Sequence, residues 1–183
     1  NTKAPGAKNF DTEKVYNNVM NRFKWGGLDK PGLYIDETVM RMCYTHRHLL
    51  AQLAMQLIAE GQNAKAEKVL RKAEKVLPEY NVPYTFMSGA ADMARAYALI
   101  GKKADASRLL NKVWADAKSY ADYYLQLTGS RFMMSQNDVL RQLYIMQNIA
   151  DITQACDRSL ADQRLKTVNA LYAVYQAKGG APY

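Results

Sequence analysis

The 183-residue chain has only two cysteines and five prolines, and it lacks long hydrophobic runs. Cys43 and Cys156 lie far apart and outside any C-x-x-C spacing, so they are either free thiols or one long-range bridge. The longest apolar stretch, residues 49–59, is interrupted by Gln52 and Gln56 and is too short to span a bilayer. No signal peptide is visible and the first residue is not Met, so we expect a fragment of a longer protein.

The alternation of apolar and polar residues that marks a β-strand does not persist for more than a few residues. This excludes sheet-based folds and the glycine-rich phosphate loops that follow a strand. A hydrophobic content of 49% with 23% charged residues excludes global disorder. We expect residues 1–10 to form a flexible arm and residues 11–183 to form one all-α domain.

Two segments repeat with the same internal spacing at an offset of 40 residues, measured from Gly61 to Gly101. The matched positions are Leu50, Leu53, Ala54, Leu57, Gly61, Ala66, Leu70 and Ala73, then Ala90, Met93, Ala94, Tyr97, Gly101, Ala106, Leu110 and Val113. This is the pattern of the tetratricopeptide repeat, a helix-turn-helix unit. It predicts about seven helices in antiparallel pairs that form a right-handed array. Its repeat units lie at about 47–78 and 87–118, and a degenerate pair at 136–178 caps the end.

Capping residues and glycines predict where the helices begin and end. The first begins at Asp11, with Phe10 packed on Val15 as a hydrophobic staple. The predicted limits are Asp11 to Gly26–Gly27, Asp36 to Gly61, Ala64 to Leu77, Pro83 to Gly101, Ala104 to Leu127, a sixth helix capped by Ser135, and a seventh opened by Ser159 and ended by Gly179–Gly180. The second of these helices is longer than one repeat requires.

The net charge is +8, and the densest basic stretch lies on one predicted helix. Its members are Lys65, Lys68, Arg71, Lys72 and Lys75. An apolar stripe accompanies them, so a solvated outer helix face explains this stretch better than a nucleic-acid footprint does. Exposed aromatic residues are not interleaved with the lysines, as a single-strand binder requires. The alternative is an acidic partner or an anionic membrane surface, because either would use the same stripe.

No constellation of residues indicates catalysis, a metal site or a cofactor. Cys43 and His46 lie three residues apart on a predicted helix, but zinc needs three or four converging ligands and the chain has no second cluster. His48 points to a different face from His46. Asp36 and Glu37 are explained by helix capping. The thirteen tyrosines are explained mainly by packing between helices.

A binding surface can be inferred instead, because the first helix of each stacked pair lines the concave side of such arrays. The predicted peptide-binding residues on that side are His48, Gln52, Met55, Arg95 and Leu99. An arginine beside apolar side chains suits an extended peptide with a carboxylate. The alternative is that a terminal helix of the chain fills this groove.

The loop at Trp25, Gly26 and Gly27 is the second candidate site. Two glycines allow a close backbone approach, and Trp25 carries a large apolar area. We expect Trp25 to anchor the loop on the first repeat. The alternative is that the loop docks on another part of a longer protein.

Several motifs resemble a known family. They are N-R-F-K-W-G-G-L-D at 21–29, Y-I-D-E at 34–37, Arg41-Met42, N-V-P-Y at 81–84 and Y-Y-L at 123–125. Together they resemble the C-terminal region of large multi-spanning membrane proteins of Bacteroidetes, whose membrane half is similar to protein O-mannosyltransferases. The resemblance implies that this fragment is the soluble tail on the periplasmic face of the membrane. It also implies that glycosyl transfer belongs to the membrane half, so no catalytic residue is carried over.

These observations predict a non-catalytic helical-repeat module for protein–protein interaction. Its partner is a protein or a peptide, which includes the membrane half of the same chain. Nucleic acid is not the expected partner, and the fragment itself has no transmembrane segment. The alternatives are a basic domain that binds nucleic acid or an anionic membrane surface, and an enzyme domain in an all-helical fold.

Overall fold

The computed structural model describes residues 11–180, and this part of the chain contains seven α-helices and no β-strand. The helices are α1 (Thr12–Asn21), α2 (Glu37–Ala59), α3 (Asn63–Val76), α4 (Ala90–Leu99), α5 (Lys103–Gln126), α6 (Gly129–Gln154) and α7 (Arg158–Ala177). The prediction of an all-α fold with about seven helices is confirmed. The arm predicted at residues 1–10 lies outside the described residues.

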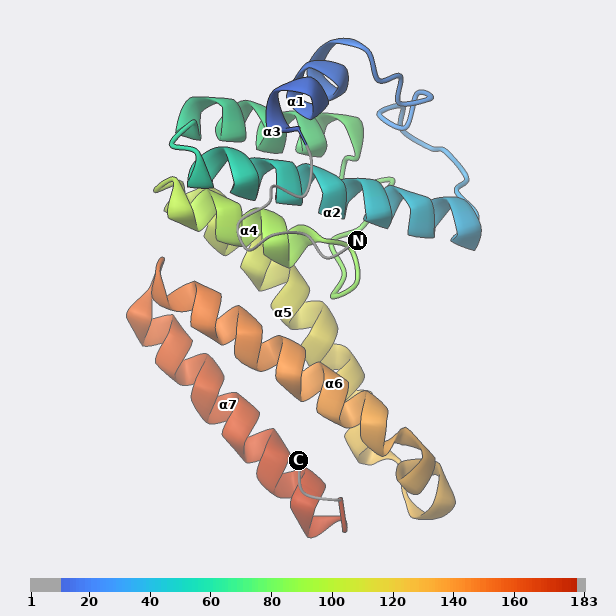
Figure 1. Cartoon of the computed structure of the whole chain (residues 1–183). Helices are drawn as coiled ribbons and strands as arrows, with labels where there is room; N and C mark the ends of the chain where they lie inside the picture. Colours follow the sequence, from blue (N-terminus) through green and yellow to red (C-terminus); the bar gives the residue numbers. More distant parts are fainter. Residues whose placement is uncertain (1–10, 181–183) are drawn as a thin grey trace, which may run out of the picture.

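The helices from α2 onward form three antiparallel pairs, α2 with α3, α4 with α5, and α6 with α7 (Figure 1). Successive pairs stack through different helices, because α4 packs mainly on α2, whereas α6 packs mainly on α5 and only touches α4. Helix α1 lies across α2 and α3 at the start of the stack. The two ends of the stack are therefore formed by α1 and by the α6/α7 pair.

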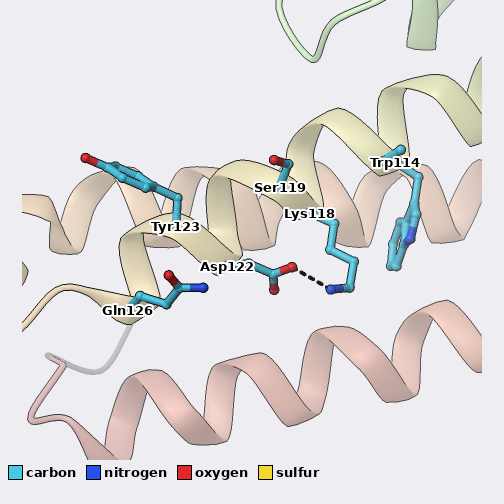
Figure 2. Close-up of a pocket in the computed structure, with 7 residues that line it drawn as sticks. Trp114, Lys118, Ser119, Asp122, Tyr123 and Gln126 are labelled. Carbon is cyan, nitrogen blue, oxygen red and sulfur yellow. Dashed lines mark hydrogen bonds and ion pairs between the residues drawn. The ribbon is translucent and has the colours of Figure 1, made fainter.

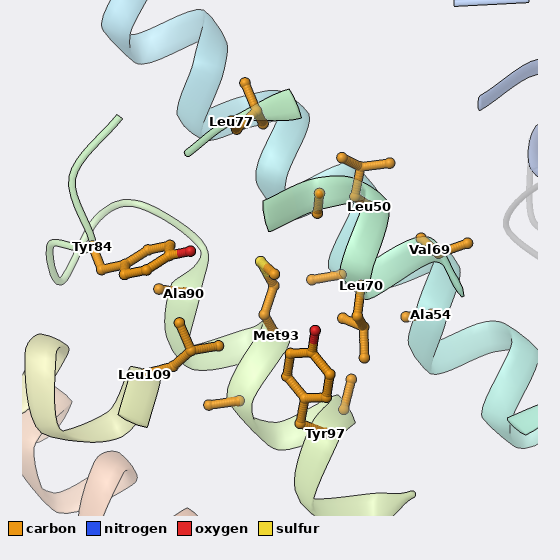
Figure 3. Close-up of a cluster of buried hydrophobic side chains, with 14 of the residues drawn as sticks. Leu50, Ala54, Val69, Leu70, Leu77, Tyr84, Ala90, Met93, Tyr97 and Leu109 are labelled. Atoms are coloured by element: carbon orange, nitrogen blue, oxygen red, sulfur yellow. The ribbon is translucent and has the colours of Figure 1, made fainter. Parts of the chain in front are cut away.

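The residues of the two repeats form the main core, which Figure 3 shows in part. Leu50, Leu53, Ala54 and Leu57 of α2 are fully buried, and so are their equivalents on α4. Gly61 and Gly101 end the first helix of each pair with φ angles of 75° and 77°. A left-handed conformation at this position favours glycine, which explains why both repeats carry it.

The third pair follows the same spacing with one residue fewer at its turn. On α6 the equivalent positions are Met146, Ile149, Ala150 and Thr153, and all four are buried. On α7 they are Ala161, Leu165 and Val168. Thr153 and Ala161 are eight positions apart, whereas Leu57 and Ala66 are nine apart. The third pair departs from the repeat at this turn, which has no glycine, and also at Thr153, which replaces Leu57 or Tyr97, and at Leu165, which is only half-buried.

Two predicted helix starts are confirmed. The Asp11 carboxylate accepts a hydrogen bond from the Lys14 amide at 3.0 Å, and Asp36 accepts one from Val39 at 2.9 Å. Phe10, predicted to pack on Val15, lies outside the described residues. The predicted end of the first helix is wrong, because α1 stops at Asn21, well before the two glycines.

Pro83 does not begin the fourth helix, because α4 starts only at Ala90. The carbonyls of Val82 and Pro83 instead accept hydrogen bonds from the Arg47 guanidinium, at 2.6 and 3.1 Å. These bonds hold the preceding segment in an irregular path. Helix α4 is therefore only 10 residues long, whereas α2, its counterpart in the first pair, has 23 residues.

The predicted starts of the last two helices are also wrong. Helix α6 begins at Gly129, and Ser135 lies inside it, where its hydroxyl donates to the Arg131 carbonyl at 2.9 Å. Helix α7 is capped by Asp157, whose carboxylate accepts from the Leu160 amide at 3.0 Å. An aspartate two residues before Ser159 therefore provides the cap.

Candidate functional site

Helices α2 and α4 lie side by side, and α6, which packs mainly on α5, also touches α4 (Figure 1). Two side-chain contacts connect them. His48 Nδ1 on α2 lies 2.8 Å from the Asp92 carboxylate on α4. Arg95 on α4 donates to the Asn148 side-chain oxygen on α6 at 2.7 Å. These bridges fix the spacing of the three helices.

The five residues predicted to bind a peptide lie on α2 and α4, but they do not converge on a hollow. His48 and Arg95 form the bridges described above, and Met55 is half-buried against the core. Gln52 is exposed, and Leu99 is 57% exposed. Only His48 borders a groove. The five residues therefore do not form one hollow, and their role in binding a peptide stays a prediction.

The groove lies over the first half of α2, where this helix extends beyond the shorter α4. Its lining consists of Ile35, Glu37, Met40, Arg41, Tyr44, Thr45, His48 and Met87. Apolar side chains from Ile35, Met40, Tyr44 and Met87 dominate it. The Glu37–Arg41 ion pair, at 2.5 Å, lies on its rim. The unusual predicted length of the second helix was the signal in the sequence that points to this surface.

His48 closes one end of this groove between two hydrogen-bond acceptors. Its Nδ1 faces the Asp92 carboxylate and its Nε2 lies 3.2 Å from the Met87 carbonyl. Only the protonated ring donates from both nitrogens. The hydrogen bond to Asp92 raises the pKa of His48, partial burial opposes the rise, and the Met87 carbonyl supports it. The imidazolium form therefore ties α2 to α4 and to the segment that carries Met87.

Arg47 holds in place the segment that forms the other wall of the α2 groove. The sequence analysis did not identify this residue. This side chain is fully buried, and its guanidinium donates to the carbonyls of Leu77, Val82, Pro83 and Ser88 at 2.6–3.3 Å. It also lies over the Tyr84 ring, 4.7 Å from its centroid. Burial lowers the pKa of Arg47. One feature of the sequence could have identified Arg47, because it is a charged residue on the apolar stripe of α2, between Cys43 and Leu50.

The loop at Trp25 packs on the stack. Trp25 is half-buried against the core and makes edge contacts with Phe23 and His46, with ring centroids 6.0 and 5.9 Å apart. Gly26 and Gly27 have φ angles of 62° and 77°, which favour glycine.

Asn81 connects this loop to the segment between the first two pairs. Its buried amide donates to the carbonyls of Leu28 and Lys30 at 2.7 and 2.6 Å. The Tyr80 hydroxyl donates to the Asp29 carbonyl. The loop after Trp25 is therefore held against the same segment that Arg47 organises.

A second hollow lies along α5 (Figure 2). It is lined by Trp114, Ala115, Lys118, Ser119, Asp122, Tyr123 and Gln126, all from this one helix. Lys118 and Asp122 form an ion pair at 2.6 Å across its middle. Because each charge is neutralised by the other and one helix supplies the whole lining, this hollow is a weaker candidate than the groove on α2.

The described residues hold no group of three side chains that could bind a metal ion. Cys43 is a buried free thiol and Cys156 a half-buried one, and burial raises the pKa of both. A raised pKa disfavours the nucleophilic thiolate. None of the helices between residues 11 and 180 is long and apolar enough to cross a membrane.

The basic stripe lies on the outer surface of α3, and part of its charge is already paired. Arg71 makes two hydrogen bonds to Asp105 on α5, at 2.7 and 2.6 Å, and Lys65 pairs with Glu13 on α1. These pairs connect neighbouring elements, so they explain two of the five cations structurally.

Comparison with known proteins provides no further guide. No family model, no curated protein and no solved structure matches this chain.

Proposed function

We propose that this chain is a non-catalytic module of the tetratricopeptide type that binds a segment of another protein in the groove over the first half of α2. The observation that carries this proposal is the groove itself, whose lining includes two methionines, a tyrosine and an isoleucine beside hydrogen-bonding groups. Flexible methionine side chains adapt to varied apolar partners. Thr45, His48 and the Glu37–Arg41 pair offer polar contacts at the rim.

The helical-repeat interpretation supports the same function. Three helix pairs stack on one another, and the His48–Asp92 and Arg95–Asn148 contacts join their first helices. The surface is therefore preorganised, which reduces the entropy lost on binding. Such arrays use this surface for recognition. Of the five residues predicted from the sequence, His48 lines the groove. The others then continue the binding face beyond it, over Gln52 and Leu99.

The test is selection of peptides of about 15 residues from a random phage-displayed library on the immobilised chain. We expect selected peptides to lose at least tenfold in affinity on the Met87→Lys variant. Met134→Lys is the matched control, because Met134 is 84% exposed on α6, away from the groove. Equal loss on both variants, or no loss on either, would contradict the assignment of the groove.

From the family resemblance alone, we also propose that the chain is the periplasmic tail of a membrane glycosyltransferase-like protein, and that its partner is the membrane half of that protein. A reporter fusion after residue 183 in the parent protein tests the location. Activity of a periplasmic reporter supports it, and activity of a cytoplasmic reporter contradicts it.

A further inference from the structure

The segment of residues 85–89 forms the other wall of the α2 groove and contributes Met87 to its lining. This segment belongs to no helix, so hydrogen bonds from neighbouring elements hold its backbone. The Met87 carbonyl lies 3.2 Å from Nε2 of His48, and the Phe86 amide donates to the Asp116 carboxylate on α5 at 2.8 Å. Of these two partners, the histidine is the one whose ordinary pKa lies close to neutral pH.

The His48 ring is held in one orientation against this wall. Its Nδ1 lies 2.8 Å from the Asp92 carboxylate on α4, while its Nε2 faces the Met87 carbonyl. Gly89 lies against the ring with a φ of 77°, and a Cβ at this position would lie 3.1 Å from the ring Cγ and 3.2 Å from Nδ1. The fit therefore requires glycine and leaves the ring little room to turn away from its two acceptors.

The two acceptors make the contact with the wall depend on a proton. The imidazolium donates to both acceptors, whereas the neutral ring has one N–H group and one lone pair. The hydrogen bond to the Asp92 carboxylate is the stronger one because its acceptor is charged, so the neutral ring keeps its proton on Nδ1. The lone pair of Nε2 then faces the Met87 carbonyl oxygen, and the hydrogen bond to the wall is lost.

The groups around His48 decide at which pH this loss occurs. The hydrogen bond to Asp92 raises the pKa of His48, partial burial opposes the rise, the facing carbonyl supports it, and the charge of Arg47 on α2 lowers it. The Glu37–Arg41 ion pair, which also lines the groove, is neutralised internally. The wall segment itself carries no ionisable side chain. Because the pKa is raised, the hydrogen bond to the wall is present at acid pH and is lost as the pH rises through the folded-state pKa.

We propose that His48 is a pH-sensitive switch for the α2 groove, whose protonated ring fixes the Met87 wall and whose neutral ring releases it. This inference rests on the proposed function, because it describes how that site is regulated. A fixed wall loses less conformational freedom when a peptide binds, so the protonated chain binds a peptide more tightly. By reciprocity, a bound peptide favours the protonated ring.

The first measurement needs no ligand. In the ¹³C- and ¹⁵N-labelled chain, the ring signals of His48 are followed from pH 5 to pH 9 together with the Ser88 amide nitrogen, which shares a peptide bond with the Met87 carbonyl. We expect both signals to change with one midpoint. In Asp92→Asn, the midpoint of His48 should move to lower pH, and Ser88 should no longer change at the original midpoint.

Asp116→Asn is the matched control for this titration. It removes the other ionisable partner of the wall segment and keeps a hydrogen-bond acceptor for the Phe86 amide, so the midpoint should stay the same. A Ser88 signal that does not follow His48 in the parent chain overturns the proposal. A Ser88 signal that still changes at the original midpoint in Asp92→Asn also overturns it.

The second measurement compares the affinity of a histidine-free peptide, selected at pH 5.5 for binding in the groove, at pH 5.5 and pH 8.5. We expect the parent chain and Asp116→Asn to bind it at least threefold more tightly at pH 5.5. His48→Gln cannot take up a proton at this position and should bind equally at both pH values. Equal binding by the parent chain at both values overturns the proposal. Failure to select any groove-binding peptide contradicts the proposed function alone, and the titration without ligand then decides whether His48 controls the wall.

Discussion

At the scale of residues, two buried arginines hold together segments that are far apart in the sequence. Arg47 binds the segment between the first two pairs, as described above. Arg164 donates to the Thr153 hydroxyl and to the Asn111 side chain, both at 2.6 Å, and lies 5.0 Å from the centroid of the Trp114 ring. Both terminal nitrogens of each guanidinium find partners, whereas the buried Nε atoms of Arg47 and Arg164 have none among the described residues. Because a buried charge needs such partners, these contacts constrain the backbone and the helices around each arginine.

Replacing Arg47 with methionine tests this role. The change leaves four carbonyls without their donor, so we expect the free energy of unfolding to fall by about 3–5 kcal/mol. Urea denaturation measures it. Arg41→Met on the same helix is the control, because Arg41 is exposed and its loss should change stability by less than about 0.5 kcal/mol. Equal effects of the two variants would contradict the role of Arg47.

The His48–Asp92 contact makes stability depend on pH. The folded-state pKa of His48 is raised, so its contribution is fully present below the unfolded pKa and is lost as pH rises through the folded pKa. We expect Asp92→Asn to destabilise the chain more at pH 5.5 than at pH 8.5. Urea denaturation at both pH values measures the difference. A destabilisation that is the same at both values would show that the contact does not depend on the imidazolium.

At the scale of elements, the repeat spacing predicted the helices of the first two pairs to within a few residues, apart from the start of α4. Apolar spacing predicts which residues of a helix are buried, and Gly61 and Gly101 mark the turns. The start of α4 could not be predicted, because it depends on the contacts of Arg47 with carbonyls that lie 30 to 41 residues further along the chain. Because α4 starts late, it is short and leaves the first half of α2 uncovered, which creates the groove over α2. It was therefore visible in the sequence only as an unusually long second helix.

Ala66 tests the repeat register, because it is fully buried where α2 and α3 pack together. We expect Ala66→Leu to overpack this contact and to lower the free energy of unfolding by about 1–3 kcal/mol. Ala64→Leu, at the exposed second residue of α3, is the control and should change little. An unchanged melting temperature for Ala66→Leu would show that the register is wrong.

Trp25 tests whether the loop before α2 is anchored on the stack. Its indole packs on the core and on His46, so we expect Trp25→Ala to cost about 1–3 kcal/mol in thermal or urea unfolding. Phe23→Ala, at a 44% exposed neighbour, should cost less. Full stability of Trp25→Ala together with impaired function of the longer protein would instead support docking of the loop on another part of that protein.

At the scale of the whole molecule, three helix pairs stack in sequence and leave hollows at the surface. The irregular segment between the first two pairs opens the groove on α2, and another hollow lies between the helices of the last pair. The sequence predicted a binding module and a binding face on its first helices. It could not indicate these two hollows, because each depends on which helix covers which, and this is a property of the assembled stack.

Peptide binding in the α2 groove is tested most directly by a map of amide chemical-shift changes in the ¹⁵N-labelled chain when a library-selected peptide is added. We expect the largest changes to cluster at residues 35–48 and around Met87, and Met87→Lys to abolish them at the same peptide concentration. Changes centred on the α5 hollow at residues 114–126, with none along the first half of α2, would contradict it.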